Sequence, residues 1–276
     1  MFENRKLLIV TKHKKEEVLQ PIFSKALKVQ CKVSDFIDTD LLGTFSGEKE
    51  RELGPLETAR KKCLIGLEKS DFDLAVSSEG SFGPHPQIPF VSADDEILFF
   101  YDKKNNIEIW TRDISTKTNF NSDKFNDYKK LKEFAKMVQF PSHAIILKAR
   151  DNEKIIKGIT NWKALEDSFL IIKSKNEFVF AETDMRAMYN PSRMEVIKQC
   201  AEKLIQKILS ICPDCKFPGY SITDYVRGLP CEVCNSPTRS VLKHILVCKK
   251  CNHTEQINYP ENQKFEDPMY CDYCNP

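Results

Sequence analysis

The sequence predicts an α/β domain with a mixed sheet, followed by a small cysteine-rich module. Over roughly the first 210 residues, short apolar runs of strand length alternate with segments of helical periodicity. Four Cys-x-x-Cys pairs then close the chain within its last 65 residues. At 276 residues with 41% apolar side chains, the chain is long enough for one large core and a small second domain. We therefore expect two domains, residues 1–210 and 211–276.

The first predicted elements are a strand from Lys6 to Val10 and a helix from Glu16 to Leu27. The turn between them is Thr11-Lys-His-Lys-Lys15, at the carboxyl end of the strand and the amino end of the helix. Free backbone N–H groups and the helix dipole favour an anion at such a position. Thr11, Lys14 and Lys15 are therefore candidate phosphate-binding residues, and an ordinary solvated turn is the alternative.

A glycine-flanked polar loop, Gly43 to Arg51, precedes a predicted helix from Leu56 to about Glu68. Charged residues on this helix share one face and apolar residues line another, which suits either a solvated helix or the wall of a site. The charged face holds Glu57, Arg60 and Lys61.

A strand from Phe72 to Ser77 is expected to run into a loop from Ser78 to Pro86 that is rich in glycine and proline. Glu79 in this loop is well placed to hold Mg²⁺ or to activate water. Ile97 to Tyr101 and Ile107 to Trp110 then predict the two strands of a hairpin.

The following segments predict a helix from Asp123 to Val138, a strand from His143 to Ala149, a helix or helix–strand junction from Trp162 to Ile172, and a last helix over 194–210. Arg186 and Arg193 bracket a polar run before that last helix. Planar guanidinium groups suit bidentate contacts with phosphate, and a salt bridge with Asp184 would orient one of them. A structural ion pair at a domain junction is the alternative.

The first turn, the segment Glu57-Thr-Ala-Arg-Lys-Lys62 and the segment Ser78-Glu-Gly-Ser81 resemble, in order and spacing, the inosine triphosphate pyrophosphatase-like superfamily over residues 6 to 110. The whole chain, including Thr183-Asp-Met-Arg-Ala187 and the terminal cysteines, also resembles an uncharacterised bacterial family known as a domain of unknown function with a C-terminal zinc-ribbon module.

The first resemblance implies a Mg²⁺-dependent hydrolase of a nucleoside triphosphate or a related phosphorylated metabolite, either a pyrophosphohydrolase or a phosphatase. It implies that Lys14, Lys15, Arg60 and Lys62 neutralise phosphates, and that Glu57 and Glu79 hold Mg²⁺ and position water. The second resemblance implies no activity. The alternative is a non-enzymatic zinc-binding protein that senses a phosphorylated ligand or contacts a protein or nucleic-acid partner.

The cysteine pairs predict two structural zinc ions. Zn²⁺ binds four thiolates at about 2.3 Å, and a two-residue gap lets one turn aim two sulfurs at one metal. No secretory signal precedes the first strand, so we expect a reducing cytoplasm, which favours metal over disulfides. The eight ligands are Cys212, Cys215, Cys231, Cys234, Cys248, Cys251, Cys271 and Cys274.

The sequence also gives an expectation for which two Cys-x-x-Cys pairs share each metal ion. The strand-like run Val241 to Val247 between the second and third pairs is typical of a zinc ribbon. We expect the two inner pairs to share one metal and the two outer pairs to share the other. Sequential pairing, first with second, is the alternative.

Charge argues against nucleic acid as a partner. From Cys212 onward the chain has seven Lys or Arg and eight Asp or Glu, and two fully thiolate zinc sites would bring the module to about −5. Nucleic-acid binding needs clustered cations instead. No apolar stretch reaches the 18 residues of a membrane span. The expected partners are a phosphorylated small molecule and, through the zinc module, a protein.

Overall fold

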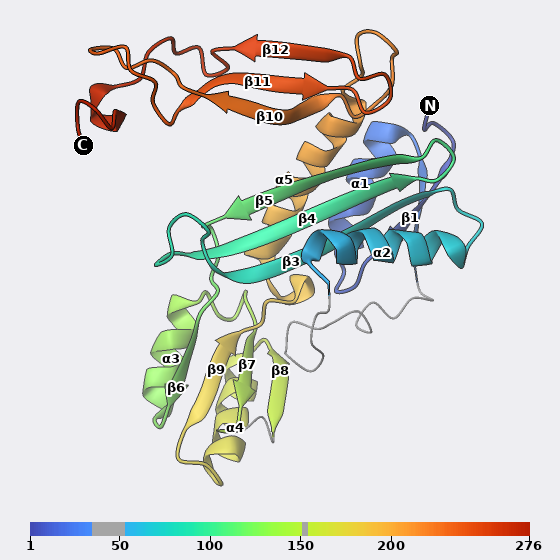
Figure 1. The fold of residues 1–276 in the computed structure, drawn as a ribbon. Coiled ribbons are helices and arrows are strands. Elements are labelled where there is room, and N and C mark those ends of the chain that lie inside the picture. The colour runs from blue at the N-terminus through green and yellow to red at the C-terminus, as the bar shows by residue number, and fades with distance from the viewer. Residues whose placement is uncertain (35–52, 151–153) are drawn as a thin grey trace. The chain divides into compact units, whose positions relative to one another are not determined.

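The computed structural model describes residues 1–34, 53–150 and 154–276 of the chain (Figure 1). The loop predicted from Gly43 to Arg51 lies outside these described residues. The chain divides into two compact units, Met1–Leu204 and Ile205–Pro276. No helix in the described ranges is both long and apolar enough to cross a membrane.

The first unit contains a five-stranded mixed sheet, as the sequence predicted. The strand order is β2-β1-β3-β4-β5. β1, β2 and β3 are parallel, while β4 and β5 continue the sheet as an antiparallel meander. The strands are β1 (Lys6–Val10), β2 (Gln30–Val33), β3 (Leu74–Pro84), β4 (Ser92–Asp102) and β5 (Ile107–Ser115).

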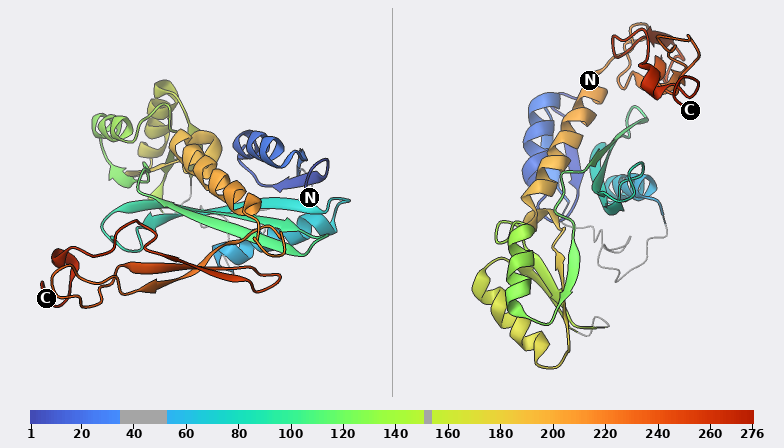
Figure 2. Two further views of the ribbon diagram at one scale, coloured as in Figure 1. Left: turned by 90° about the horizontal axis from the view of Figure 1, so that it is seen from above. Right: turned by 90° about the vertical axis from the view of Figure 1, so that its left-hand side faces the viewer.

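Helices cover both faces of this sheet. Figure 2 shows α1 (Glu16–Leu27) and α5 (Pro191–Leu209) on one face and α2 (Pro55–Glu68) on the other. The apolar stripe of α2 packs against the sheet through Ala59, Cys63 and Leu67, which form a core with Phe99 of β4. β1 lies between β2 and β3, and the chain leaves it over one face and returns to β3 over the other, so the carboxyl ends of β1 and β3 form a topological switch point.

β3 is longer than the sequence predicted. Ser78 to Gly83 was expected to be a loop, but these residues continue the strand and pair with β4 without interruption, from Leu74 opposite Asp102 to Pro84 opposite Ser92. The reason is that β4 is also longer than predicted. Its backbone pairs with the glycine-containing segment of β3 along the whole length of that segment. The Ser78–Gly83 segment is therefore held rigidly in the sheet.

The first unit also contains a second sheet that the sequence did not predict. It is antiparallel, with the order β6-β9-β7-β8, and the helices α3 and α4 belong to the same region. The helix expected from Asp123 instead starts at Tyr128, because Asp127 caps it by accepting a hydrogen bond from the backbone of Lys129. The elements are β6 (Ser122–Phe125), α3 (Tyr128–Met137), β7 (Ile145–Lys148), β8 (Ile155–Ile159), α4 (Trp162–Lys173), β9 (Val179–Thr183) and the 3₁₀ helix η3 (Ala187–Tyr189).

The second unit is built on a three-stranded antiparallel sheet with the order β10-β11-β12. β11 (Val241–Val247) is the strand that the sequence predicted, and β12 (Thr254–Asn258) follows the third cysteine pair. β10 (Ser221–Arg227) was not predicted, because its mostly exposed side chains lack a buried apolar face. A 3₁₀ helix, η4 (Pro268–Tyr270), precedes the last cysteine pair.

Candidate functional site

The Cys-x-x-Cys turns repeat one backbone geometry. In three of them the residue after the second cysteine adopts a left-handed conformation: Lys216 (φ 58°), Asn235 (φ 57°) and Asn252 (φ 60°). The backbone N–H of each of these residues donates to the carbonyl of the first cysteine, at 2.9–3.0 Å. This tight turn directs both thiols of a pair to the same side, which is what a shared metal requires.

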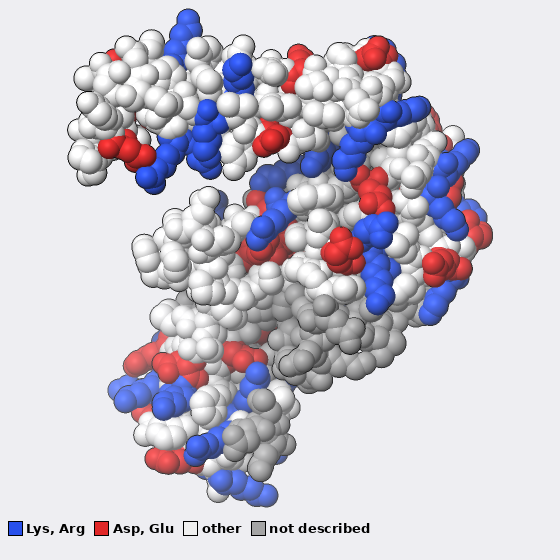
Figure 3. Space-filling view, viewed as in Figure 1, with Lys and Arg blue, Asp and Glu red and all other residues white. Residues whose placement is uncertain are grey.

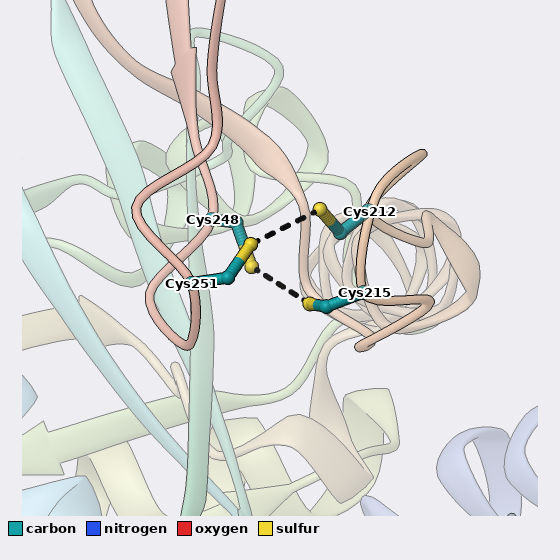
Figure 4. Close-up of side chains that lie close together, drawn as sticks. All are labelled: Cys212, Cys215, Cys248 and Cys251. Atoms are coloured by element: carbon teal, nitrogen blue, oxygen red, sulfur yellow. Dashed lines mark hydrogen bonds between the residues drawn. The ribbon is translucent and has the colours of Figure 1, made fainter.

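The eight cysteines form two groups of four, Cys212/Cys215/Cys248/Cys251 and Cys231/Cys234/Cys271/Cys274. Figure 4 shows two turns of the first group facing each other through their sulfur atoms. The Sγ–Sγ distances across the first group are 3.7 and 3.6 Å, and those across the second are 3.8 and 3.6 Å. Four thiolates at about 2.3 Å from a tetrahedral Zn²⁺ would lie about 3.8 Å apart. All eight thiols are free of disulfides, so both groups can hold a metal ion.

The observed pairing is interleaved, first with third and second with fourth, so the pairing expected from the sequence is wrong. β10 and β11 are antiparallel, with Ser221 opposite Val247, and this places the pair before β10 next to the pair after β11. At the other end of the module, Glu266 pairs with Cys231 and exchanges backbone hydrogen bonds with the segment around it. That contact brings the last cysteine pair to the second one. Strand direction, which spacing does not reveal, decides the pairing.

The second candidate site lies at the switch point of the mixed sheet. β1 ends at Val10, opposite Ser77, while β3 continues past it. The turn from Thr11 to Lys15 bends sharply there, with His13 (φ 64°) and Lys14 (φ 60°) both left-handed. Lys15 is only 6% exposed, and its Nζ lies 2.9 Å from Ser78 Oγ. Thr11 Oγ1 lies 3.4 Å from the same hydroxyl oxygen.

Charged side chains approach this edge from both faces of β3. Glu79 points towards α2, where its carboxylate contacts the Nζ of Lys62. Lys62 Nζ also lies 3.5 Å from the backbone oxygen of Ser78. On the opposite face, Lys15 reaches Ser78 from the N-cap of α1. Two buried lysines, one in α2 and one at the N-cap of α1, therefore converge on consecutive residues of one strand.

Glu96 of β4 links the cations on the α1 and α5 face. Its Oε1 accepts a hydrogen bond from Arg193 Nε at 2.6 Å, and its Oε2 lies 3.8 Å from Lys15 Nζ. The Arg193 guanidinium also lies over the ring of Phe82, 4.9 Å from its centroid. Burial lowers the pKa of Lys15 to about 8, although the Glu96 carboxylate opposes that shift. We call Thr11, Lys15, Lys62, Ser78, Glu79, Glu96 and Arg193 the switch-point site.

Gly80 is required by this arrangement. It lies opposite Glu96 in the ladder, and a Cβ built on it would come within 3.0 Å of both the Glu96 carboxylate and the Arg193 guanidinium. A side chain at position 80 would therefore force this buried ion pair apart. Close approach of other atoms, and not a turn, explains glycine at this place in a strand.

We expect Gly80→Ala to lower the free energy of unfolding by about 1–3 kcal/mol, the usual cost of overpacking a buried site. Gly83→Ala is the matched control on the same strand, because a Cβ there meets nothing within 4 Å. Urea denaturation of the two variants measures the difference. Equal stability of both variants would contradict the tight packing over Gly80.

The structure leaves four of the predicted site residues away from this site. Glu57 lies exposed on the first turn of α2. Arg60 pairs with Glu108 of β5 at 2.8 Å. Lys14 is exposed and pairs with Glu17 at 3.5 Å, while Arg186 binds Asp184 through two hydrogen bonds and stacks on Tyr189.

These positions do not support the Mg²⁺ site expected at Glu57 and Glu79. The Glu79 carboxylate contacts an ammonium group, which a metal would have to displace. Within the described ranges, the groups of three or more metal-ligating side chains are the two cysteine groups.

Glu96 was not among the site residues predicted from the sequence. Its side chain is fully buried, although it ends an acidic run, Asp94-Asp95-Glu96, just before the apolar part of β4. Charges at the entrance of a strand are usually solvated, so the run did not show that this carboxylate is buried and needs a cation as a partner. That partner, Arg193, is 97 residues away in the chain, so periodicity alone does not reveal it.

Comparison with known proteins identifies one family. The model of the family described as "Domain of unknown function (DUF6671)" matches residues 62–276, which include both cysteine groups and the switch-point residues from Lys62 onward. No curated protein matches the chain.

Proposed function

Because the chain belongs to the family described as domain of unknown function DUF6671, we propose its function from the geometry of its two kinds of site. The protein holds two structural Zn²⁺ ions in its second unit. It binds a phosphorylated small molecule, a nucleoside triphosphate or a related metabolite, at the switch-point site and hydrolyses a phosphoanhydride or phosphoester bond of it.

Zinc is the metal that best suits the cysteine groups. Four thiolates in tetrahedral spacing are typical of structural zinc, and a site with four protein ligands leaves no open position for a substrate. The Cys212/Cys215/Cys248/Cys251 group also packs against Tyr220, Phe217 and Leu246, so the metal and a small apolar cluster stabilise the same end of the module. The zinc ions are therefore assigned a folding role.

The convergence of Lys15 and Lys62 on Ser78 and Glu79 is the observation that carries the ligand proposal. The carboxyl edge of parallel strands at a switch point is where open α/β sheets bind ligands. Buried cations of this kind stabilise phosphate oxygens strongly, because water does not screen them. A phosphate would replace part of the contacts that these cations now make with carboxylates.

Glu79 is the proposed general base. Its carboxylate would take a proton from water, whose oxygen forms a bond to phosphorus while the bond from phosphorus to the leaving oxygen breaks. The lysines would balance the charge that develops on the phosphoryl oxygens. Mg²⁺ dependence stays a proposal, since this ion is usually held by one or two carboxylates together with the phosphates of the substrate.

We expect the zinc-loaded protein to release phosphate or pyrophosphate from a member of a panel of canonical and deaminated nucleoside triphosphates, and Glu79→Gln to abolish that release. Loss of a general base costs typically 10² to 10⁴-fold in rate. The assay is run with and without Mg²⁺ to test the metal requirement.

The second candidate is a non-enzymatic sensor of a phosphorylated ligand, with the zinc module as a protein contact. Exposed apolar side chains on that module, such as Val233, Met269 and Tyr273, favour a protein partner. On the face seen in Figure 3, the few Lys and Arg residues of the module lie scattered among uncharged ones. A surface that binds the phosphates of a nucleic acid needs clustered cations instead. Ligand binding without turnover in the wild type and in Glu79→Gln would favour this sensor.

A further inference from the structure

Asp94 is a buried carboxyl group that the proposed reaction does not use. It lies on β4, two residues before Glu96, and is 1% exposed. Neither of its carboxyl oxygens has a hydrogen-bond partner among the residues that the structure describes. The carboxylates of Glu79 and Glu96, by contrast, each contact a buried cation.

The register of the sheet places Asp94 beside the switch-point site. Residues two apart on a strand point to the same face, so Asp94 lies on the face where Glu96 meets Arg193 and Lys15. Across the ladder Asp94 faces Phe82, the ring on which Arg193 stacks. The carboxyl group therefore extends the site along β4 and away from Lys15.

The charges around Asp94 come from four parts of the fold. Glu96 and Asp95 lie on its own strand, Arg193 comes from α5 and Lys15 from the N-cap of α1. On β5, Asp113 lies opposite Glu96 and pairs with Lys203 of α5. Both nearby cations contact Glu96, so they compensate that carboxylate first.

An ionised carboxylate in this position would lack donors and face a second negative charge. Burial without hydrogen bonds strongly disfavours the charged form, and a group in this situation takes up a proton instead. Burial first and the Glu96 carboxylate second raise the pKa of Asp94 to about 8, against the opposing effect of Arg193 and Lys15. At neutral pH the group is thus largely protonated, and its O–H has no hydrogen-bond partner among the described residues.

We propose that Asp94 is a protonated hydrogen-bond donor of the switch-point site, whose O–H donates a hydrogen bond to an oxygen atom of the phosphorylated ligand. The ligand role rests on the proposed function; the protonated state of Asp94 does not. A neutral acid adds a donor for a phosphate oxygen without adding a further charge to a site where cations and carboxylates nearly balance. It also excludes a ligand that offers only donors at this position.

The protonated state is tested without a ligand, by the pH dependence of stability. A group whose pKa is raised on folding stabilises the protein below its unfolded pKa and loses that contribution as pH rises towards its folded pKa. We expect wild-type stability to fall relative to Asp94→Asn between pH 5 and pH 8, by up to tenfold in the folding equilibrium constant per pH unit. Lys15 is present in both proteins, so the difference isolates Asp94.

The ligand role is tested by calorimetric titration with inorganic triphosphate at pH 7. Asp94→Asn keeps a neutral donor and is expected to bind as the wild type does, whereas Asp94→Ala is expected to bind about tenfold more weakly, the cost of one lost hydrogen bond to a charged group. A constant stability difference from pH 5 to 8 would overturn the protonated state. Equal binding by all three proteins would overturn the donor role, and absence of binding in the wild type would overturn the proposed function itself.

Discussion

Replacement of both Cys231 and Cys248 by serine is expected to remove both zinc ions, because the interleaved pairing puts these two residues in different metal sites. Each site would lose one of four thiolates, and the remaining three ligands do not complete a structural site. Zinc content should fall from about two ions per chain to about none. The second unit should unfold with it, because structural zinc contributes about 10–16 kcal/mol of apparent binding free energy in small domains.

The matched control is the double variant Cys212→Ser with Cys248→Ser. These residues belong to one group, so the other group stays intact and about one zinc ion should remain. The pairing expected from the sequence predicts the reverse for the two double variants, and sequential pairing predicts complete loss in both. Metal analysis of the purified proteins by mass spectrometry separates the three arrangements.

Glu96→Ala should be the most destabilising single substitution at the switch-point site. It leaves the buried Arg193 and Lys15 without the carboxylate between them. Breaking a buried ion pair by removing one partner costs about 3–5 kcal/mol, because an uncompensated charge stays in the interior. Urea denaturation followed by tryptophan fluorescence measures this loss, since Trp110 lies on β5, the strand next to Glu96.

Asp95→Ala is the control for this prediction, one residue away on the same strand. Asp95 pairs with Arg112 at 2.6 Å, but the Arg112 side chain is 45% exposed. Exposed pairs contribute at most about 1 kcal/mol. If Asp95→Ala destabilised the protein as much as Glu96→Ala, the buried position of the Glu96 cluster would be refuted.

Local patterns predicted much of the mixed sheet. The apolar run from Lys6 to Val10 and the helical spacing from Glu16 to Leu27 became β1 and α1 with the predicted bounds, because burial alone explains both. The antiparallel second sheet could not be predicted in the same way. β7 lies within the strand predicted from His143 to Ala149, but β6 is mostly exposed and is defined by its pairing with the distant β9.

The candidate sites, like the fold, could be predicted only in part. The cysteine ligands follow from their chemistry, whereas their pairing depends on the direction of β10, a strand whose exposed residues give no periodic signal. Lys15 was identified from charge next to a strand end, whereas Lys62 was implied only by the family resemblance of the segment Glu57 to Lys62. Their positions relative to Glu96 and Arg193 depend on contacts between elements far apart in the chain, and the spacing of residues in the sequence does not predict those contacts.

Release of phosphate or pyrophosphate by the zinc-loaded protein tests the proposed hydrolase most directly. The expected result is turnover of at least one nucleoside triphosphate by the wild type, its loss in Glu79→Gln, and its retention in Asp95→Asn, where the altered carboxylate pairs with a surface arginine. All three proteins should bind about two zinc ions, which shows that they are folded. Two results would contradict hydrolysis at the switch-point site. One is that the folded wild type releases no phosphate or pyrophosphate from any nucleotide of the panel, and the other is equal turnover in wild type and Glu79→Gln.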